Sequence, residues 1–232
     1  MIHTVLFDLD GTLADTAPDL AHALNCVLEE QGQTALPFEA IRPIVSHGGT
    51  VLLSFGFNLQ PDAPQFDTLR DRFLSIYRDN IAVNTRLFPG MESVLKTIEQ
   101  RGMSWGVVTN KPAWLTNPLM EQLGLADRAV CIISGDTLEQ RKPHPAPMLL
   151  ACKLAGKSAS ECLYIGDAAR DIEAGRNAGM KTLVAMYGYI GTDDKPEQWG
   201  ADSFVQHPQE IIQWLDQDST VEQELTAQNK QA

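Results

Sequence analysis

Short apolar runs alternate with amphipathic helical stretches from residue 90 to residue 216, and this alternation limits the possible folds more than any other feature of the chain. Such a pattern requires right-handed crossovers between parallel strands, so it predicts a sheet with helices on both faces. The strands are expected at residues 103–109, 130–134, 162–165, 182–185 and 203–205, and the helices between them end at Gly102, Gly124, Gly156 and Gly179. The predicted class is α/β, with a doubly wound, Rossmann-like parallel sheet.

One more strand is expected at residues 4–7, but a block that reads as helical throughout separates it from the others. Apolar side chains repeat at helical spacing in two stretches of this block, residues 20–28 and 66–77. The chain after residue 216 is polar and has no periodicity. We therefore predict a Rossmann-like core made of residues 1–14 and 82–216, an inserted all-helical cap at 15–81, and a disordered tail at 217–232.

The 232 residues carry a net charge of -12 and contain no basic run. This charge argues against nucleic acid or an anionic membrane as the main partner, but a metal ion and one lysine can still create a local phosphate site. No apolar run reaches the roughly 20 residues that span a bilayer, and no signal peptide is visible. The four cysteines form no C-x-x-C pair, which agrees with a reducing compartment. We expect a cytoplasmic monomer or homodimer.

Polar side chains gather where the predicted strands end. In open α/β sheets, ligands bind beyond the carboxyl ends of the strands, so these residues are candidates for one common site. In chain order they are Asp8, Asp10, Thr109, Asn110, Lys142, Asp167 and Asp171. The sequence therefore predicts that carboxylates, a hydroxyl and a lysine converge on one edge of the sheet.

These residue types suit the transfer of a phosphoryl group. A carboxylate nucleophile that forms a covalent intermediate divides one difficult step into two easier ones. A second carboxyl can protonate the leaving group and later deprotonate water. Magnesium prefers oxygen ligands and commonly lies between carboxylates and phosphate oxygens. Lys142 and Thr109 can hold the phosphoryl oxygens over which negative charge is spread in the transition state.

Four short segments resemble the motifs of the haloacid dehalogenase superfamily, and they occur in the family's order at the expected strand ends. Asp8-Leu9-Asp10-Gly11-Thr12-Leu13 resembles the first motif and Val107-Val108-Thr109-Asn110 the second. Lys142-Pro143 resembles the third, and Gly166-Asp167-Ala168-Ala169-Arg170-Asp171 resembles the fourth. The resemblance covers about residues 1–216. It implies the haloacid dehalogenase-like fold and a phosphatase that acts on a small phosphorylated metabolite.

The resemblance also implies roles for individual residues and a Mg²⁺ cofactor. Asp8 would be the nucleophile and Asp10 the general acid and base, while Thr109 and Lys142 bind the phosphoryl group. The metal ligands would be Asp8, the backbone carbonyl of Asp10, and Asp167, with Asp171 orienting a metal-bound water. Asp171 can also serve as a helix N-cap, and both roles can hold together.

Longer strings narrow the family resemblance to two branches. Thr109-Asn110-Lys111-Pro112 and Lys142-Pro143-His144-Pro145 look like the phosphoglycolate phosphatase branch, whereas Val45-Ser46-His47-Gly48-Gly49 resembles a branch that acts on N-acetylmuramic acid 6-phosphate during cell-wall recycling. The sequence leaves both substrates open. The candidate substrate contacts are Asn110, Arg42, Ser46, His47, Gly48 and Gly49. Among them, Arg42 is suited to pair with a carboxylate.

Other activities of the same superfamily fit less well. A dehalogenase needs neither Asp10 nor magnesium, and a phosphonoacetaldehyde hydrolase needs a lysine in the cap, where this chain has none before Lys96. A sugar-phosphate mutase remains open, because it shares both aspartates and the cap. A non-catalytic binding module on the same fold is the alternative from a different class of protein. Such a module would not need Asp8, Asp10, Lys142 and Asp167 together.

Overall fold

The computed structural model describes the backbone of residues 1–229 and the side chains of residues 1–219. Its main sheet consists of β1 (Thr4–Phe7), β4 (Ser104–Val108), β5 (Ile132–Ile133), β6 (Cys162–Gly166), β7 (Lys181–Ala185) and β8 (Ser203–Val205). All pairings in this sheet are parallel, and the order is β5-β4-β1-β6-β7-β8. The order reverses beside β1, as in other doubly wound sheets. The predicted fold class is confirmed.

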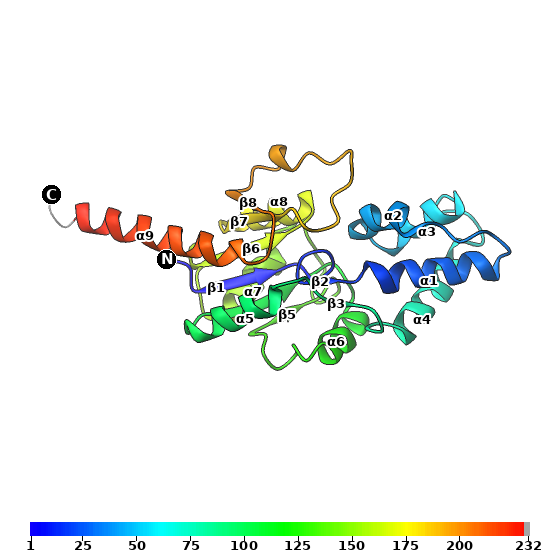
Figure 1. The fold of residues 1–232 in the computed structure, drawn as a ribbon, viewed down its shortest axis with the longest axis horizontal. Helices are drawn as coiled ribbons and strands as arrows, with labels where there is room; N and C mark the ends of the chain where they lie inside the picture. Colours follow the sequence, from blue (N-terminus) through cyan, green and yellow to red (C-terminus); the bar gives the residue numbers. More distant parts are fainter. Residues whose placement is uncertain (230–232) are drawn as a thin grey trace.

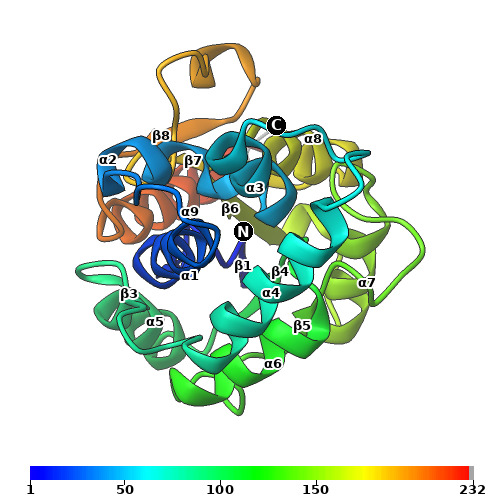
Figure 2. The ribbon, with the colours of Figure 1, turned by 90° about the vertical axis from the view of Figure 1, so that its right-hand side faces the viewer.

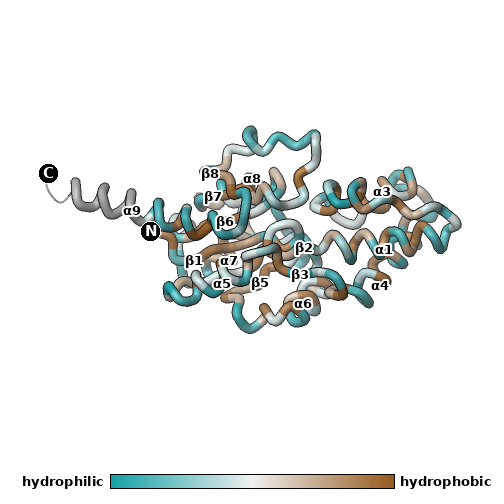
Figure 3. Tube along the Cα trace, in the orientation of Figure 1, coloured by the Kyte–Doolittle hydropathy of each residue, from teal (hydrophilic) through white to brown (hydrophobic). Residues whose placement is uncertain are grey.

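Helices cover both faces of this sheet (Figure 1). Successive residues of a strand point to opposite faces, and β1 accordingly divides its side chains between two apolar clusters. Val5 and Phe7 pack with α5 (Met91–Gln100) and α9 (Glu210–Asn229). Leu6 packs with α7 (Ala146–Ala155) and α8 (Ala169–Ala178) on the other face. Figure 3 shows hydrophobic residues, in brown, in the central strands and interspersed with hydrophilic residues, in teal, along the helices.

A group of helices, called here the helical unit, lies beyond the carboxyl ends of the strands (Figures 1 and 2). It consists of α1 (Ala17–Glu30), α2 (Phe38–Ile41), the 3₁₀ helix η1 (Arg42–His47), α3 (Gly49–Phe57) and α4 (Phe66–Asp79). Apolar side chains of α1 and α4, among them Leu24 and Phe73, are fully buried between these helices. The unit covers the residues for which the sequence predicts a cap, and its action as a cap remains a prediction.

Two short strands join the helical unit to the sheet. β2 (Ala14–Asp15) and β3 (Arg86–Leu87) pair antiparallel, so the outgoing and returning segments lie side by side. The buried carboxylate of Asp19 accepts hydrogen bonds from the backbone N–H groups of Asn84, at 3.0 Å, and Thr85, at 2.8 Å. This ribbon was not predicted, because two-residue strands are too short to produce a detectable periodicity.

The C-terminal segment differs from the sequence prediction. A disordered tail was expected from residue 217, but α9 continues to Asn229, and residues 230–232 lie outside the described residues. Residues 217–229 include three Gln and two Glu, which have high helix propensity even where no amphipathic stripe exists. The remaining elements are α6 (Ala113–Gln122), η2 (Ala159–Glu161) and η3 (Pro196–Gln198). None of the described helices is long and apolar enough to cross a membrane.

Candidate active site

Aligned strand ends bring the predicted carboxylates together. Phe7, the last residue of β1, lies opposite Val107 of β4 on one side and Ile165 of β6 on the other. The residues that follow these strands therefore emerge at the same level of the sheet edge. Ligand atoms of three buried carboxylates, those of Asp8, Asp167 and Asp171, all lie within 4.8 Å of one another.

Lys142 supplies the positive charge at the centre of this cluster. Its ammonium nitrogen lies 2.9 Å from Asp8 Oδ1 and 2.7 Å from Asp171 Oδ1, and its side chain is 1 % exposed. The same nitrogen donates to the carbonyl of Val108, at 2.9 Å, and to the hydroxyl of Tyr164, at 2.8 Å. These contacts from β4 and β6 fix the lysine against the carboxylates, where its charge balances part of the buried negative charge.

Asn110 helps to place Lys142. Its side-chain amide donates to the carbonyl of Lys142 at 3.0 Å and accepts the backbone N–H of the same residue at 3.1 Å. Asn110 lines the cavity, but its amide is paired with the backbone of Lys142, and its predicted contact with substrate remains a prediction. The neighbouring Thr109 is buried, and its hydroxyl oxygen accepts the backbone N–H of Lys111.

Burial and mutual repulsion raise the pKa of two carboxyl groups in the acidic cluster, those of Asp8 and Asp167. Burial raises the pKa of Asp8 above its usual value; Lys142 opposes this rise, and the charge of Asp171 adds to it. Burial, together with the charges of Asp8 and Asp171, raises the pKa of Asp167 to about 7. A divalent cation would relieve both effects, because it replaces proton charge with metal charge. The donor set of three carboxylates therefore fits an oxygen-seeking metal ion.

Asp167 is also held by the helical unit. Ser46 Oγ donates to Asp167 Oδ2 at 2.6 Å, and the backbone N–H of Tyr189 donates to the same oxygen at 2.9 Å. The structure thus places the hydroxyl of Ser46 against a predicted metal ligand, and Ser46 also lines the cavity, so its contact with substrate remains a prediction. The carbonyl of Ser46 accepts a hydrogen bond from Arg170, at 2.6 Å, so this turn contacts the core twice.

Gly11 is required next to Asp167. Its φ is +85°, and a Cβ built on it would overlap the carboxylate of Asp167. The first motif therefore needs glycine here both for backbone conformation and for close approach.

Arg42 does not reach the cavity. Its guanidinium donates to the carbonyls of Gly188, at 3.2 Å, and Tyr187, at 3.4 Å, and lies 4.9 Å from the ring centre of Tyr189. These residues belong to the loop after β7, so Arg42 braces the helical unit against the core. The predicted pairing of Arg42 with a substrate carboxylate receives no support from this position.

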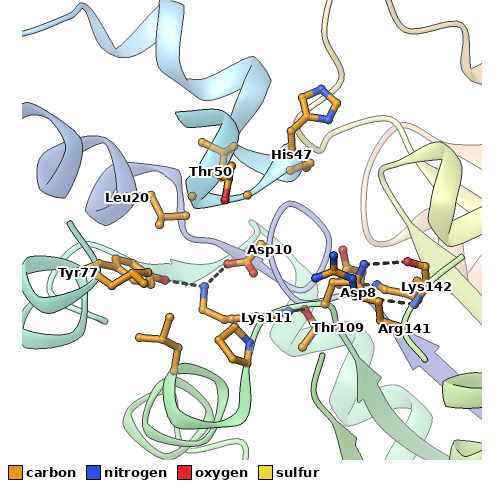
Figure 4. A pocket seen from close by; sticks show the side chains of 18 of the residues that line it. Asp8, Asp10, Leu20, His47, Thr50, Tyr77, Thr109, Lys111, Arg141 and Lys142 are labelled. Atoms are coloured by element: carbon orange, nitrogen blue, oxygen red, sulfur yellow. Dashed lines mark hydrogen bonds and ion pairs between the residues drawn. The ribbon is translucent and has the colours of Figure 1, made fainter. Parts of the chain in front are cut away.

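The helical unit and the core enclose a cavity of about 730 Å³ above the acidic cluster. Its lining includes Asp8, Asp10, Thr109 and Lys142 from the core, and the turn that runs from Ser46 to Thr50. Figure 4 shows the ring of His47 turned away from Asp8 and Asp10, whereas the hydroxyl of Thr50 points toward them. Gly48 and Gly49 line the cavity, and His47 is largely exposed. Their contact with a substrate remains a prediction.

Asp10 lies outside the three-carboxylate cluster. Its Oδ1 accepts hydrogen bonds from Thr16 Oγ1, at 2.6 Å, and from Lys111 Nζ, at 2.8 Å. Sequence reasoning quoted Lys111 within a motif and assigned it no role, and it likewise missed Arg170. Lys111 directly follows the second motif and Arg170 lies within the fourth, so their positions in the sequence could have marked both as candidates. The motifs alone, however, do not show which side chains these residues contact.

Comparisons with known proteins show which family the chain belongs to. The family model described as haloacid dehalogenase-like hydrolase matches residues 5–185. An N-acetylmuramic acid 6-phosphate phosphatase of Pseudomonas putida is 43 % identical over 93 % of this chain and 96 % of the relative. A phosphoglycolate phosphatase of Xanthomonas campestris is 42 % identical over 89 % of this chain and 93 % of the relative.

Solved structures show the same architecture. The crystal structure of a predicted phosphoglycolate phosphatase from Haemophilus somnus superposes with a TM-score of 0.81, at 26 % identity, and covers 92 % of this chain and 98 % of its own. The chain therefore belongs to the haloacid dehalogenase-like hydrolase family. The predicted superfamily and the predicted enzyme class, a phosphatase, are confirmed.

Proposed function

We propose that this protein is a Mg²⁺-dependent phosphomonoester hydrolase that forms an aspartyl-phosphate on Asp8. The observation that carries the proposal is the geometry around that carboxylate. Asp8 Oδ1 accepts the backbone N–H of Leu9, at 2.8 Å, and lies 2.9 Å from Lys142 Nζ. With Oδ1 held in this way, Oδ2 is the oxygen available for attack on phosphorus.

The residues of the site divide the reaction between them. Asp8 Oδ2 forms a bond to phosphorus as the bond to the leaving oxygen breaks, and Asp10 gives that oxygen a proton. Water then attacks the aspartyl-phosphate, Asp10 takes its proton, and phosphate leaves as Asp8 is regenerated. Lys142 and the Thr109 hydroxyl hold phosphoryl oxygens. Asp8, Asp167 and the backbone carbonyl of Asp10 would hold Mg²⁺, with the carboxylate of Asp171 beside them, and the ion would supply positive charge that offsets the phosphoryl group.

Cavity size is the basis for proposing a substrate. About 730 Å³ lies within the range of pockets that enclose drug-sized ligands, and it exceeds what two-carbon phosphoglycolate fills. The relative from Pseudomonas putida is named for N-acetylmuramic acid 6-phosphate, which is an amino-sugar phosphate of suitable size. We therefore favour that compound. Phosphoglycolate is the second candidate, because a relative of nearly equal identity is named for it.

One assay tests both the proposed Mg²⁺-dependent mechanism and the proposed substrate. Purified protein is incubated with N-acetylmuramic acid 6-phosphate and 2-phosphoglycolate side by side, and phosphate release is measured with Mg²⁺ and with chelator. We expect release from both to require Mg²⁺, with the higher kcat/KM for the amino-sugar phosphate. A higher kcat/KM for phosphoglycolate would overturn the substrate assignment. Metal-independent release would overturn the proposed mechanism.

A further inference from the structure

A chain of polar contacts connects Asp10 to the helical unit. Lys111 Nζ lies 2.8 Å from Asp10 Oδ1 and 2.9 Å from the hydroxyl of Tyr77, a residue of α4 (Figure 4). The ring of Tyr77 is fully buried, and its centre is 4.6 Å from the same nitrogen. Side chains from the loop after β1, the loop after β4 and the helical unit therefore meet at one ammonium group.

Burial makes these contacts obligatory for Lys111. Its side chain is 7 % exposed, and a buried ammonium is costly unless it is paired with a charge and hydrogen-bonded. In the described part of the chain, Asp10 is the carboxylate that lies within ion-pair distance of it. Replacement of Lys111 would thus release Asp10 from one of the two donors that hold it.

Both donors act on the same oxygen of Asp10. Thr16 Oγ1 and Lys111 Nζ bind Oδ1, and no described residue donates a hydrogen bond to Oδ2. Asp10 lines the cavity, so Oδ2 is the atom left free for the leaving group and for water. Proton transfer needs heavy atoms within hydrogen-bond distance, and a misplacement of about 1 Å can cost on the order of 10²-fold in rate.

We propose that Lys111 is a positioning residue, which aims Oδ2 of Asp10 at the leaving oxygen, and that Tyr77 holds Lys111 in place from the helical unit. This inference deepens the proposed function and depends on it. Proton transfer in the core then requires the helical unit to be seated, because one of the two groups bonded to the ammonium belongs to α4.

Phenyl phosphates separate this role from binding of the substrate. p-Nitrophenolate is a weak base and leaves without being protonated, whereas phenolate is a stronger base and leaves faster when an acid protonates it. Neither leaving group carries a carboxylate. kcat/KM reports the steps up to transfer of the phosphoryl group to Asp8. Loss of Asp10 positioning must therefore lower kcat/KM for phenyl phosphate much more than for p-nitrophenyl phosphate.

The test compares Lys111→Met and Tyr77→Phe with the parent enzyme in the presence of Mg²⁺. For Lys111→Met we expect kcat/KM to fall about tenfold or more with phenyl phosphate and to stay within about twofold with p-nitrophenyl phosphate. Tyr77→Phe removes only the hydroxyl and should show the same pattern to a smaller extent, about threefold. Lys96→Met is the matched control, since this lysine is exposed on α5 and pairs with Glu92.

Three results would overturn the inference. Equal losses with both esters would mean that Lys111 acts on the phosphoryl group or on folding, and unchanged kinetics in both variants would mean that Asp10 needs no such support. If thermal unfolding shows that Lys111→Met is not folded, Tyr77→Phe becomes the test. An unchanged ratio of kcat/KM between the two esters in that variant is then enough to refute the proposal. Failure of the parent enzyme to hydrolyse either ester would instead refute the proposed function, and the inference with it.

Discussion

The substitution Asp167→Asn should stabilise the metal-free protein while it destroys activity. Asp167 is 1 % exposed, and its pKa rises from the usual 3.8 to about 7 through burial and the charges of Asp8 and Asp171. The folded state therefore binds this proton more tightly than the unfolded state. Its contribution to stability is present below about pH 3.8 and is lost as the pH rises through about 7.

The size of the effect follows from the same shift. A rise from 3.8 to about 7, at 1.36 kcal/mol for each pH unit, corresponds to about 4 kcal/mol at pH 8. Asparagine can still accept the hydrogen bonds from Ser46 and Tyr189, although a neutral acceptor weakens each by about 1 kcal/mol. We therefore expect the free energy of unfolding at pH 8 to increase by roughly 1–4 kcal/mol.

Urea denaturation in chelator, at pH 5 and at pH 8, measures this difference. The gain should be larger at pH 8, and Mg²⁺ should stabilise the parent protein but not the variant. Asp127→Asn, at an exposed carboxylate after α6, serves as the control and should change neither value. A variant that is no more stable than the parent at pH 8 would refute the electrostatic argument.

Three further predictions concern the proposed nucleophile Asp8, Gly11 of the first motif, and Arg42, which holds the helical unit against the core. Asp8→Asn should reduce turnover by on the order of 10³ or more without changing the circular dichroism spectrum, and substantial remaining activity would exclude Asp8 as nucleophile. Gly11→Ala should cost about 1–3 kcal/mol more in unfolding than Gly32→Ala, because both have positive φ but only Gly11 faces a neighbour within 4 Å. Arg42→Ala should lower kcat/KM equally for N-acetylmuramic acid 6-phosphate and p-nitrophenyl phosphate, whereas a loss confined to the carboxylate-bearing substrate would restore the role expected from sequence.

Most of the sheet could be predicted because each buried strand is a short apolar run bounded by glycine or polar residues. The β2–β3 ribbon could not, since its four residues carry no pattern. At the end of α9 the sequence pattern stops before the helix does. Helical periodicity disappears after residue 216, yet the backbone remains helical to Asn229, where intrinsic propensity is the only local signal.

Within the site, sequence reasoning succeeded where a residue is attached to a strand end and failed where its position depends on how the helical unit meets the core. Asp8 and Asp167 converge because the register of β1 and β6 aligns the ends of both strands. Arg42 and His47 belong to the same short segment, but one side chain contacts the loop after β7 and the other turns away from the cavity. The direction of Arg42 is set by contacts with residues more than 100 positions away in the chain, and a local motif carries no record of such contacts.

The charge balance of the site explains why four short motifs indicate the function of the protein, whereas helix and strand patterns indicate only its fold. Three buried carboxylates face Lys142 and Arg170, an arrangement that opposes folding until a cation neutralises it. A chain selected only for stability would place apolar residues at these strand ends. Acidic residues at such positions therefore indicate chemistry, because folding gives no reason for them. A related argument applies to Lys111: its buried ammonium needs both Asp10 and Tyr77 as partners, a requirement that an apolar residue at this position would not impose.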